Sequence, residues 1–245
     1  MIMTAEFTTG SYDCDFNGHM SVSSVMRYLQ EAANLEHEKY GPTVGEIRRG
    51  GHALILTRAA LDVYVPLEAP RRLTVRTWLA SSGGFVFDRN TVMYESGRKV
   101  AAMKTVWGVI DTGTRRLARV DAVPLGFGTD EEELDLSAPL RARPGKDAVF
   151  SELGKHTVVY SDCDENMHMN NTVYPAMFLG FLEPREMLGK YVSSMTINYQ
   201  NEAPVGSEFT VLCAEEGGSR WFRSIRADGS TGTEARMVFS GLPVK

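Results

Sequence analysis

The chain of 245 residues is 43% hydrophobic and 23% charged, which is typical of a folded globular protein and excludes a disordered or fibrous one. A formal net charge of −5 argues against general nucleic-acid binding, and no apolar run has the length of a membrane span or the form of a signal peptide. The three cysteines have neither disulfide-framework nor metal-ligand spacing, so we predict a cytoplasmic protein without a metal site or a cofactor.

The first part of the chain predicts one helix followed by four strands. A short strand is expected at residues 5–9, and apolar residues at helical spacing from Val22 predict a helix that ends at Gly41-Pro42. Residues 42–51 are expected to be irregular and basic. Turn signals then separate four β-rich runs, at 53–65, 73–80, 85–94 and 100–110. This order favours an antiparallel α+β fold over a doubly wound sheet.

A polar segment with three prolines, residues 123–148, predicts a linker between a first half, residues 1–122, and a second half, residues 149–245. The second half repeats the plan of the first. We expect a strand at 157–160, a polar loop, a helix in the apolar run that begins at Val173, and four more strands. These strands are predicted at 192–201, 208–215, 220–227 and 234–240.

The two polar loops share the pattern Asp-Cys-Asp-x-Asn-x-His-Met, displaced by 149 positions (164 − 15). Each loop places a carboxylate, an amide and an imidazole at alternate positions: Asp15, Asn17 and His19 in the first copy, Asp164, Asn166 and His168 in the second. A polar loop before a helix is also a common helix cap, and spacing alone gives that interpretation equal weight. The repetition of loop and helix indicates a duplicated unit.

The second copy, which continues with Asn170-Asn171, resembles the active-site segment of acyl-[acyl-carrier-protein] thioesterases. Three further segments resemble the family in the same order along the chain: the first central helix at 28–33, the strand and turn that end the first half at 107–116, and the second-half strand with the catalytic glutamate at 199–203. The resemblance implies a tandem (double) hotdog fold, in which each half is an antiparallel sheet wrapped around a long central helix.

The resemblance also implies a function. It assigns catalytic roles to Asp164, Asn166, His168 and Glu202, and it places the acyl-chain pocket in the first half. The implied reaction is hydrolysis of acyl-[acyl-carrier-protein] thioesters to free fatty acid and holo carrier protein, which ends fatty acid chain extension. The implied partner is an acidic acyl carrier protein that bears an acyl-phosphopantetheine. Basic clusters could steer such a partner; they lie at Arg48-Arg49, Arg71-Arg72, Arg115-Arg116-Arg119 and Arg141-Arg143-Lys146.

Thioester hydrolysis needs an activated water or a covalent nucleophile, together with donors for the developing oxyanion. Glu202 could take a proton from water or attack directly, and His168 could position it or stabilise the oxyanion. Asp164 could orient the imidazole, and Asn166 could donate to the thioester carbonyl. Without the resemblance, Glu202 is more readily explained as a surface glutamate. Plant relatives usually have a cysteine after this glutamate, but this chain has Ala203, which excludes a thiol nucleophile there.

Several alternatives stay open. Hydrolysis of acyl-CoA and a non-catalytic acyl-binding hotdog protein are the alternative functions, whereas a dehydratase is disfavoured because the sequence has no Gly-His-Phe-Pro stretch. Glu68-Ala69-Pro70 and Glu202-Ala203-Pro204 are expected to correspond in the two copies, so symmetry would allow two sites. Asn170-Asn171, found only in the second copy, favours that copy. A homodimer is the alternative to a monomer.

Overall fold

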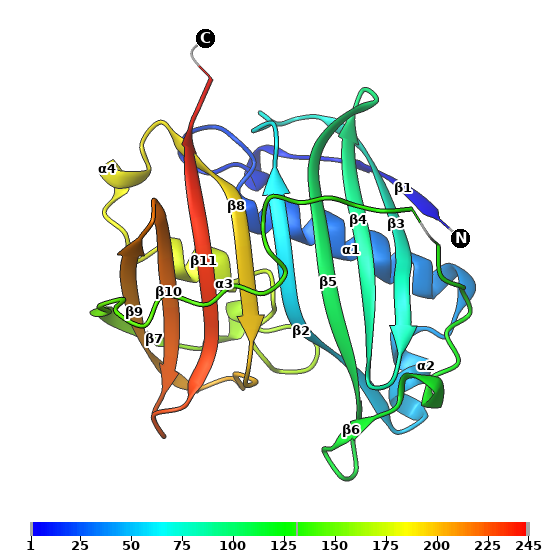
Figure 1. Cartoon of the computed structure of the whole chain (residues 1–245). Helices are drawn as coiled ribbons and strands as arrows, with labels where there is room; N and C mark the ends of the chain where they lie inside the picture. The colour runs from blue at the N-terminus through cyan, green and yellow to red at the C-terminus, as the bar shows by residue number, and fades with distance from the viewer. Residues whose placement is uncertain (1, 131, 244–245) are drawn as a thin grey trace.

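Figure 1 shows the computed structural model of the chain, which describes residues 2–130 and 132–243. In this part of the chain eleven strands form one sheet with antiparallel pairing throughout, in the order β1-β3-β4-β5-β2-β8-β11-β10-β9-β7, with β6 paired to β5. The strands are β1 Met3–Thr8, β2 His52–Val63, β3 Arg72–Gly83, β4 Val86–Glu95, β5 Arg98–Asp111, β6 Leu117–Ala118, β7 Ser151–Thr157, β8 Lys190–Tyr199, β9 Glu208–Glu216, β10 Ser219–Arg226 and β11 Thr231–Gly241. The predicted antiparallel α+β architecture is confirmed.

The two halves of the chain contribute equivalent strands in mirrored order. The first half runs β1-β3-β4-β5-β2 and the second runs β8-β11-β10-β9-β7. The strand at the joint is β2 in the first half and β8 in the second, and each is the strand that follows the helices of its half. The joint is the antiparallel pair β2–β8, in register from Arg58 opposite Asn198 to Asp62 opposite Ser194. Two hairpin-rich units that would each expose a strand edge therefore cover one another's edge.

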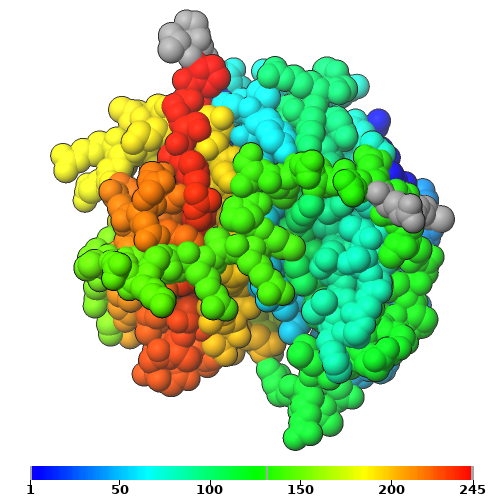
Figure 2. Space-filling view, in the orientation of Figure 1, coloured from blue at the N-terminus to red at the C-terminus, as the bar shows by residue number. Residues whose placement is uncertain are grey.

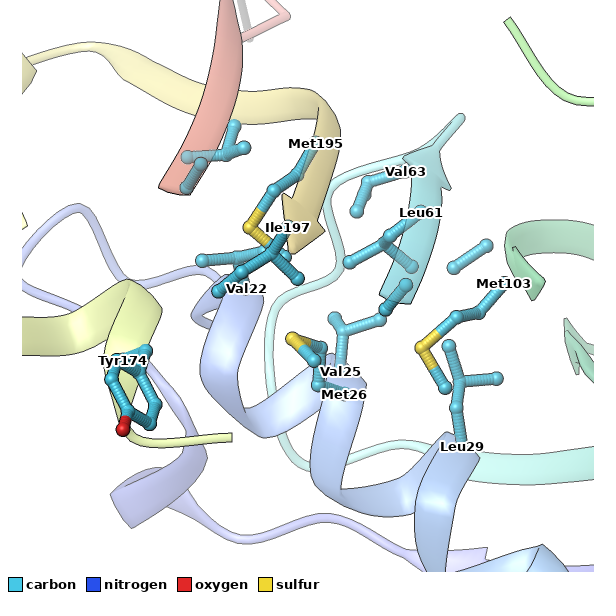
Figure 3. Close-up of a cluster of buried hydrophobic side chains, with 14 of the residues drawn as sticks. Val22, Val25, Met26, Leu29, Leu61, Val63, Met103, Tyr174, Met195 and Ile197 are labelled. Atoms are coloured by element: carbon cyan, nitrogen blue, oxygen red, sulfur yellow. The ribbon is translucent and has the colours of Figure 1, made fainter. Parts of the chain in front are cut away.

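The helix α1, Val22–Tyr40, lies against one face of the first-half strands (Figure 1). Ser21 caps its start by accepting a hydrogen bond from the Ser24 backbone N–H at 3.1 Å, and Gly41, at φ 67°, ends it as predicted. Figure 3 shows its apolar stripe facing the sheet. Leu29 is fully buried there, and burial of such a side chain contributes roughly 1.5–3 kcal/mol. None of the described helices, α1 included, is long and apolar enough to cross a membrane.

The second half departs from the expected long central helix. Its helix α3, Tyr174–Leu179, has six residues, and the chain then turns into the short α4, Pro184–Met187. Proline disfavours helical geometry in the residue before it, and Glu183 is extended with ψ 131°. Aromatic packing fills the remaining core: Phe178 stacks on Phe222 with ring centroids 5.3 Å apart. A short helix therefore suffices to cover the second-half strands.

Two further expectations about local structure were wrong. Residues 42–51 contain a helix, α2, Val44–Arg49, because Thr43 and Glu46 form a capping box in which each side chain accepts the other's backbone N–H. The strand expected at 157–160 is displaced: β7 ends at Thr157, and Tyr160–Asp162 form a 3₁₀ turn. Both segments lie beside the polar loops, so these differences shape the site.

The predicted linker crosses the face of the sheet opposite α1 (Figure 1). Side chains of the joint strands hold it there. The Asp62 carboxylate accepts hydrogen bonds from the backbone N–H groups of Ser137 and Ala138, and the Thr196 hydroxyl donates to the Pro139 carbonyl at 2.7 Å. Within residues 123–148, of which Glu131 in the acidic cluster lies outside the described residues, the chain forms no helix or strand. This segment is therefore a strap across the joint.

Candidate active site

The two polar loops fold alike. In each loop the backbone N–H of the motif aspartate donates to the carbonyl of the motif histidine, from Asp15 to His19 at 2.8 Å and from Asp164 to His168 at 3.0 Å. The residue before the histidine has positive φ in both copies, 77° at Gly18 and 59° at Met167. Positive φ is uncommon for a residue with a side chain and is often found at functional sites. The duplication predicted from sequence is thus also structural.

In the second copy His168 lies beside Glu202. The Nε2 atom of His168 is 3.9 Å from Oε2 of Glu202, and the two side chains are 31% and 38% exposed. Backbone hydrogen bonds on both sides of His168 hold the loop against the segment that carries the glutamate: Met169 donates to Ala203 at 2.8 Å, and Val205 donates to Met167 at 3.0 Å. A histidine and a glutamate distant in sequence are therefore held next to each other, partly open to solvent.

A first-half arginine contacts this glutamate. Arg115 Nη2 donates to Glu202 Oε2 at 2.5 Å. Arg115 lies in the β5–β6 turn with φ 55°. The Asp111 carboxylate closes that turn by accepting hydrogen bonds from Thr114, which hold the pKa of Asp111 below its usual value. The structured turn thus directs a cation from the first half onto the carboxylate of the second.

A second arginine, on α2, orients the amide of Asn166. Arg48 Nη2 donates to Asn166 Oδ1 at 2.7 Å and to Glu165 Oε1 at 3.0 Å. Because a guanidinium group only donates hydrogen bonds, the amide oxygen faces Arg48 and the amide NH₂ group points away from it. The NH₂ group is bonded to no other described residue. Asn166 therefore presents a donor.

The structure does not bring Asp164 into contact with the His168 imidazole. Its Oδ1 accepts the backbone N–H of Asn166 at 2.9 Å, and among the described residues it forms no hydrogen bond with the His168 imidazole. Asp164 therefore supports the loop that carries Asn166 and His168 and, within the part of the chain that the structure describes, does not contact the imidazole.

The first copy also contains a histidine–glutamate pair. His19 Nε2 is 3.9 Å from Glu68 Oε1. Its asparagine differs: the Asn17 amide NH₂ donates to the carbonyls of Met187 and Lys190 at 2.9 and 3.0 Å, and its oxygen accepts from Gly189 at 2.9 Å. The α4–β8 connection thus uses both ends of the Asn17 amide, so the first copy has no free amide donor.

The expected correspondence of Glu68 with Glu202 is wrong. Met20 donates to the carbonyl of Leu67, whereas its counterpart Met169 donates to that of Ala203. Since these acceptors are 136 residues apart, Pro204 occupies the position of Glu68 and Pro66 that of Glu202. The same displacement relates the acceptors of the next pair of equivalent bonds, Thr9 to Arg71 and Val158 to Ser207. Glu68 therefore lies beside His19 from a position equivalent to residue 204, two positions after that of Glu202.

The cysteines do not form a nucleophilic site. Burial and the neighbouring Asp162 and Asp164 raise the pKa of Cys163, and burial raises that of Cys213 to about 11. A thiolate nucleophile normally has a lowered pKa. The described residues contain no group of three or more His, Cys, Asp or Glu side chains placed to hold a metal ion.

Of the four residues predicted for the site, the structure brings His168 and Glu202 together and turns the amide of Asn166 outward, while Asp164 supports the loop. Sequence reasoning missed Arg48 and Arg115 as members. Each belongs to a pair of adjacent arginines, and Arg115 lies in the segment 107–116 that resembles the family. The sequence therefore contained a signal by which both could have been proposed.

Comparisons with known proteins show what each half of the chain resembles. Residues 10–128 match the family model of the thioesterase-like superfamily, and residues 146–240 match that of the acyl-ACP thioesterase C-terminal domain. The chain is 25% identical over 232 residues to the chloroplastic palmitoyl-acyl carrier protein thioesterase of Arabidopsis thaliana. The match covers 89% of this chain and 56% of the plant protein, so the chain spans little more than half of that relative's length.

Solved structures give the fold. The chain superposes on an acyl-ACP thioesterase from Bacteroides thetaiotaomicron with a TM-score of 0.86, 20% identity and 98% coverage of both chains. It superposes on the 12:0-ACP thioesterase from Umbellularia californica with a TM-score of 0.81 and 20% identity, over 98% of this chain and 97% of that one. The protein is thus a double hotdog, as predicted. Each half of the chain thus matches a thioesterase family model, and the two matches together cover most of the chain.

Proposed function

We propose that this protein hydrolyses acyl-[acyl-carrier-protein] thioesters to free fatty acid and holo carrier protein and so ends fatty acid chain extension. The observation that carries the proposal is the 3.9 Å approach of His168 to Glu202, in a loop whose Asn166 NH₂ group has no partner among the described residues. Hydrolysis of a thioester requires a base for the attacking water and a donor for the developing oxyanion. The matches of the two halves to thioesterase family models support the same assignment.

In the proposed mechanism the Asn166 NH₂ group donates to the thioester carbonyl oxygen and stabilises the oxyanion that develops there. Glu202 accepts a proton from water while the water oxygen attacks the carbonyl carbon, and His168 holds the carboxylate in place. The carbon–sulfur bond then breaks, the acyl group leaves as the acid, and the pantetheine sulfur takes up the proton. Direct attack by Glu202 would give an anhydride that water hydrolyses to the same products, and both routes stay open.

We place the acyl-chain pocket between α1 and the first-half strands. The core there is apolar and rich in methionine, and it includes Met26 and Leu29 of α1, Leu61 of β2 and Met103 of β5 (Figure 3). Unbranched methionine side chains adapt to irregular shapes, so this core can rearrange around an alkyl chain. A small apolar cavity already opens beside it, lined in part by Val25, Val63, Met93 and Ala101.

The experiment that tests the function is steady-state hydrolysis of acyl-carrier-protein substrates with a series of chain lengths, beside acyl-CoA with the same chains. The proposal expects turnover on the carrier-protein substrates, with a higher kcat/KM than on acyl-CoA. Higher kcat/KM on acyl-CoA throughout would support the alternative of an acyl-CoA thioesterase. A folded protein that hydrolyses neither substrate would contradict thioester hydrolysis altogether.

A further inference from the structure

A groove of about 670 Å³ lies between the linker and the outer face of the sheet where the two halves join. We call it the linker groove. Six of its lining residues matter here: Arg58, Arg141, Arg143, Lys146, Asn198 and Gln200. Figure 2 shows the linker as a ridge across this face, over the strands of the second half. The groove is distinct from the His168–Glu202 pair and has no part in the chemistry described above.

The walls of the groove are held in place. The Asn198 amide donates to the carbonyl of Ala142 at 3.4 Å, and the Gly145 backbone N–H donates to the Glu216 carboxylate at 2.9 Å. Arg58 lies opposite Asn198 in the β2–β8 joint. The linker and the joint therefore form the sides of one preformed cleft.

The groove carries positive charge with little compensation. Arg58, Arg141, Arg143 and Lys146 form no salt bridge with any described residue. The one acidic side chain in the lining, Glu234, is buried and accepts a hydrogen bond from its partner Arg223 at 2.6 Å. Burial lowers the pKa of Arg58, and so do the charges of Arg141 and Arg143, which Asp88 offsets in part. Like charges gathered in a cleft attract an anion.

The residues that line the groove on β8 directly precede the proposed active site in the chain. Tyr199 and Gln200 line the groove at the end of β8, and Glu202 follows two residues later. A ligand with an anion in the groove and a thioester at Glu202 would need a linear arm between the two groups. A phosphopantetheine thioester has this form, with a phosphate at one end, two amides along its length and the thioester at the other.

We propose that the linker groove binds the phosphate of the 4′-phosphopantetheine arm, with Arg141, Arg143 and Lys146 as donors and Arg58 at the base. This inference rests on the proposed function, since it concerns the substrate of the same active site. Arginine matches phosphate with paired, charge-assisted hydrogen bonds. Asn198 and Gln200 lie where the amides of the arm would pass. The groove then positions the thioester before Glu202 acts on it.

The test compares two small substrates that differ only in the phosphate, an acyl-pantetheine and the matching acyl-4′-phosphopantetheine. The Arg141→Gln/Arg143→Gln variant is expected to lower kcat/KM for the phosphorylated substrate about tenfold and to leave the other within about twofold. Arg98→Gln, an exposed arginine in the β4–β5 hairpin outside the groove, is the matched control. Equal loss on both substrates, or none on the phosphorylated one, overturns the inference.

Two further arms separate the inference from its alternatives. If the variant loses activity on the acyl-carrier protein but not on acyl-phosphopantetheine, the groove contacts the carrier surface, and the phosphate assignment is wrong. Calorimetric titration with 4′-phosphopantetheine and with pantetheine needs no turnover. Wild-type protein is expected to bind the phosphorylated arm more tightly, and the variant to lose that difference. This result would stand even if hydrolysis, and with it the proposed function, failed, whereas equal binding of both arms by the wild type contradicts the phosphate site.

Discussion

Arg115 and Glu202 join the two halves of the chain at the site, because the guanidinium group of the β5–β6 turn donates to the carboxylate that follows β8 at 2.5 Å. The contact is exposed, with 67% of the Arg115 side chain accessible. An exposed ion pair contributes little to folding, about 0–1 kcal/mol. Its structural consequence is orientation: one oxygen of Glu202 faces both Arg115 and His168.

We therefore expect Arg115→Ala to lower kcat by roughly three- to tenfold while KM and the melting temperature change little, because a lost exposed pair affects orientation more than folding. Arg115→Lys should restore part of the loss. Arg116→Ala, whose side chain is also exposed and forms no ion pair with the described residues, is the control. A change in KM alone, or the same effect from Arg116→Ala, would contradict an orienting role.

Replacing the proposed base should have a much larger effect. Glu202→Gln keeps the size of the side chain but removes the acceptor for the proton, so turnover should fall by a factor of ~10²–10⁴. Cys163→Ala should stay within about tenfold, since its raised pKa disfavours the thiolate. The measurement is the turnover of each variant on one acyl-carrier-protein substrate, with circular dichroism as a control for folding. A folded but inactive Cys163→Ala protein would overturn the glutamate mechanism.

Ionic strength should separate the carrier protein from small substrates. If basic clusters steer an acidic carrier, added salt should raise the apparent KM for acyl-carrier-protein substrates. The same salt should change the KM of a small uncharged thioester much less. Rates measured across a salt series test this, and an equal response of the two substrates would rule out steering.

His37 on α1 should make stability depend on pH. It is buried against Phe127, and burial, together with the charge of Arg89, lowers its pKa to about 4. The unfolded chain, with a histidine pKa near 6.5, then takes up a proton more readily than the folded one. The contribution to the free energy of unfolding is therefore complete above about pH 6.5 and is lost as the pH falls towards 4, by on the order of 3 kcal/mol.

Denaturant unfolding at a series of pH values measures this loss. In His37→Gln, which cannot titrate in this range, the pH dependence between 4 and 6.5 should flatten by the corresponding amount. The same slope in both proteins would mean that other groups account for the acid sensitivity.

Much of the fold could be predicted because its signals are local. Alternating apolar runs and turn residues placed β2 to β5 and β8 to β11 close to their observed bounds, and Gly41 ended α1 where expected. The helix α2 was also readable, since Thr43 and Glu46 have the spacing of a capping box. The short length of α3 was not expected, although Gly180 follows its last residue and Pro184 disfavours helical geometry at Glu183.

The candidate site was predictable in composition but not in arrangement. The repeated motif singled out Asn166 and His168. The contacts of Arg48 and Arg115 cross between the halves. Arg48 lies 117 and 118 positions before its partners Glu165 and Asn166, and Arg115 lies 87 positions before Glu202. No local spacing encodes such pairings. The displacement of Glu68 was not readable either, because the backbone pairs His19 with Glu68 but His168 with Pro204, and such pairing between distant segments is not written in local sequence.

The central claim is that the second copy of the motif, and not the first, performs the hydrolysis. The two histidines lie at the same 3.9 Å from a glutamate, so His168→Ala and His19→Ala form a matched pair. The Asn17 amide is fully used by the α4–β8 connection, whereas the NH₂ group of Asn166 has no partner among the residues that the structure describes.

The most direct measurement is the steady-state turnover of His168→Ala and of His19→Ala on one good acyl-carrier-protein substrate, with folding checked for both. Without the imidazole that holds the Glu202 carboxylate in place, the general-base step should fail, and turnover should fall by ~10²–10⁴ in His168→Ala. His19→Ala should keep substantial turnover and alter stability or chain-length preference. If His19→Ala is the inactive protein and His168→Ala the active one, the site lies in the first copy and the account is wrong.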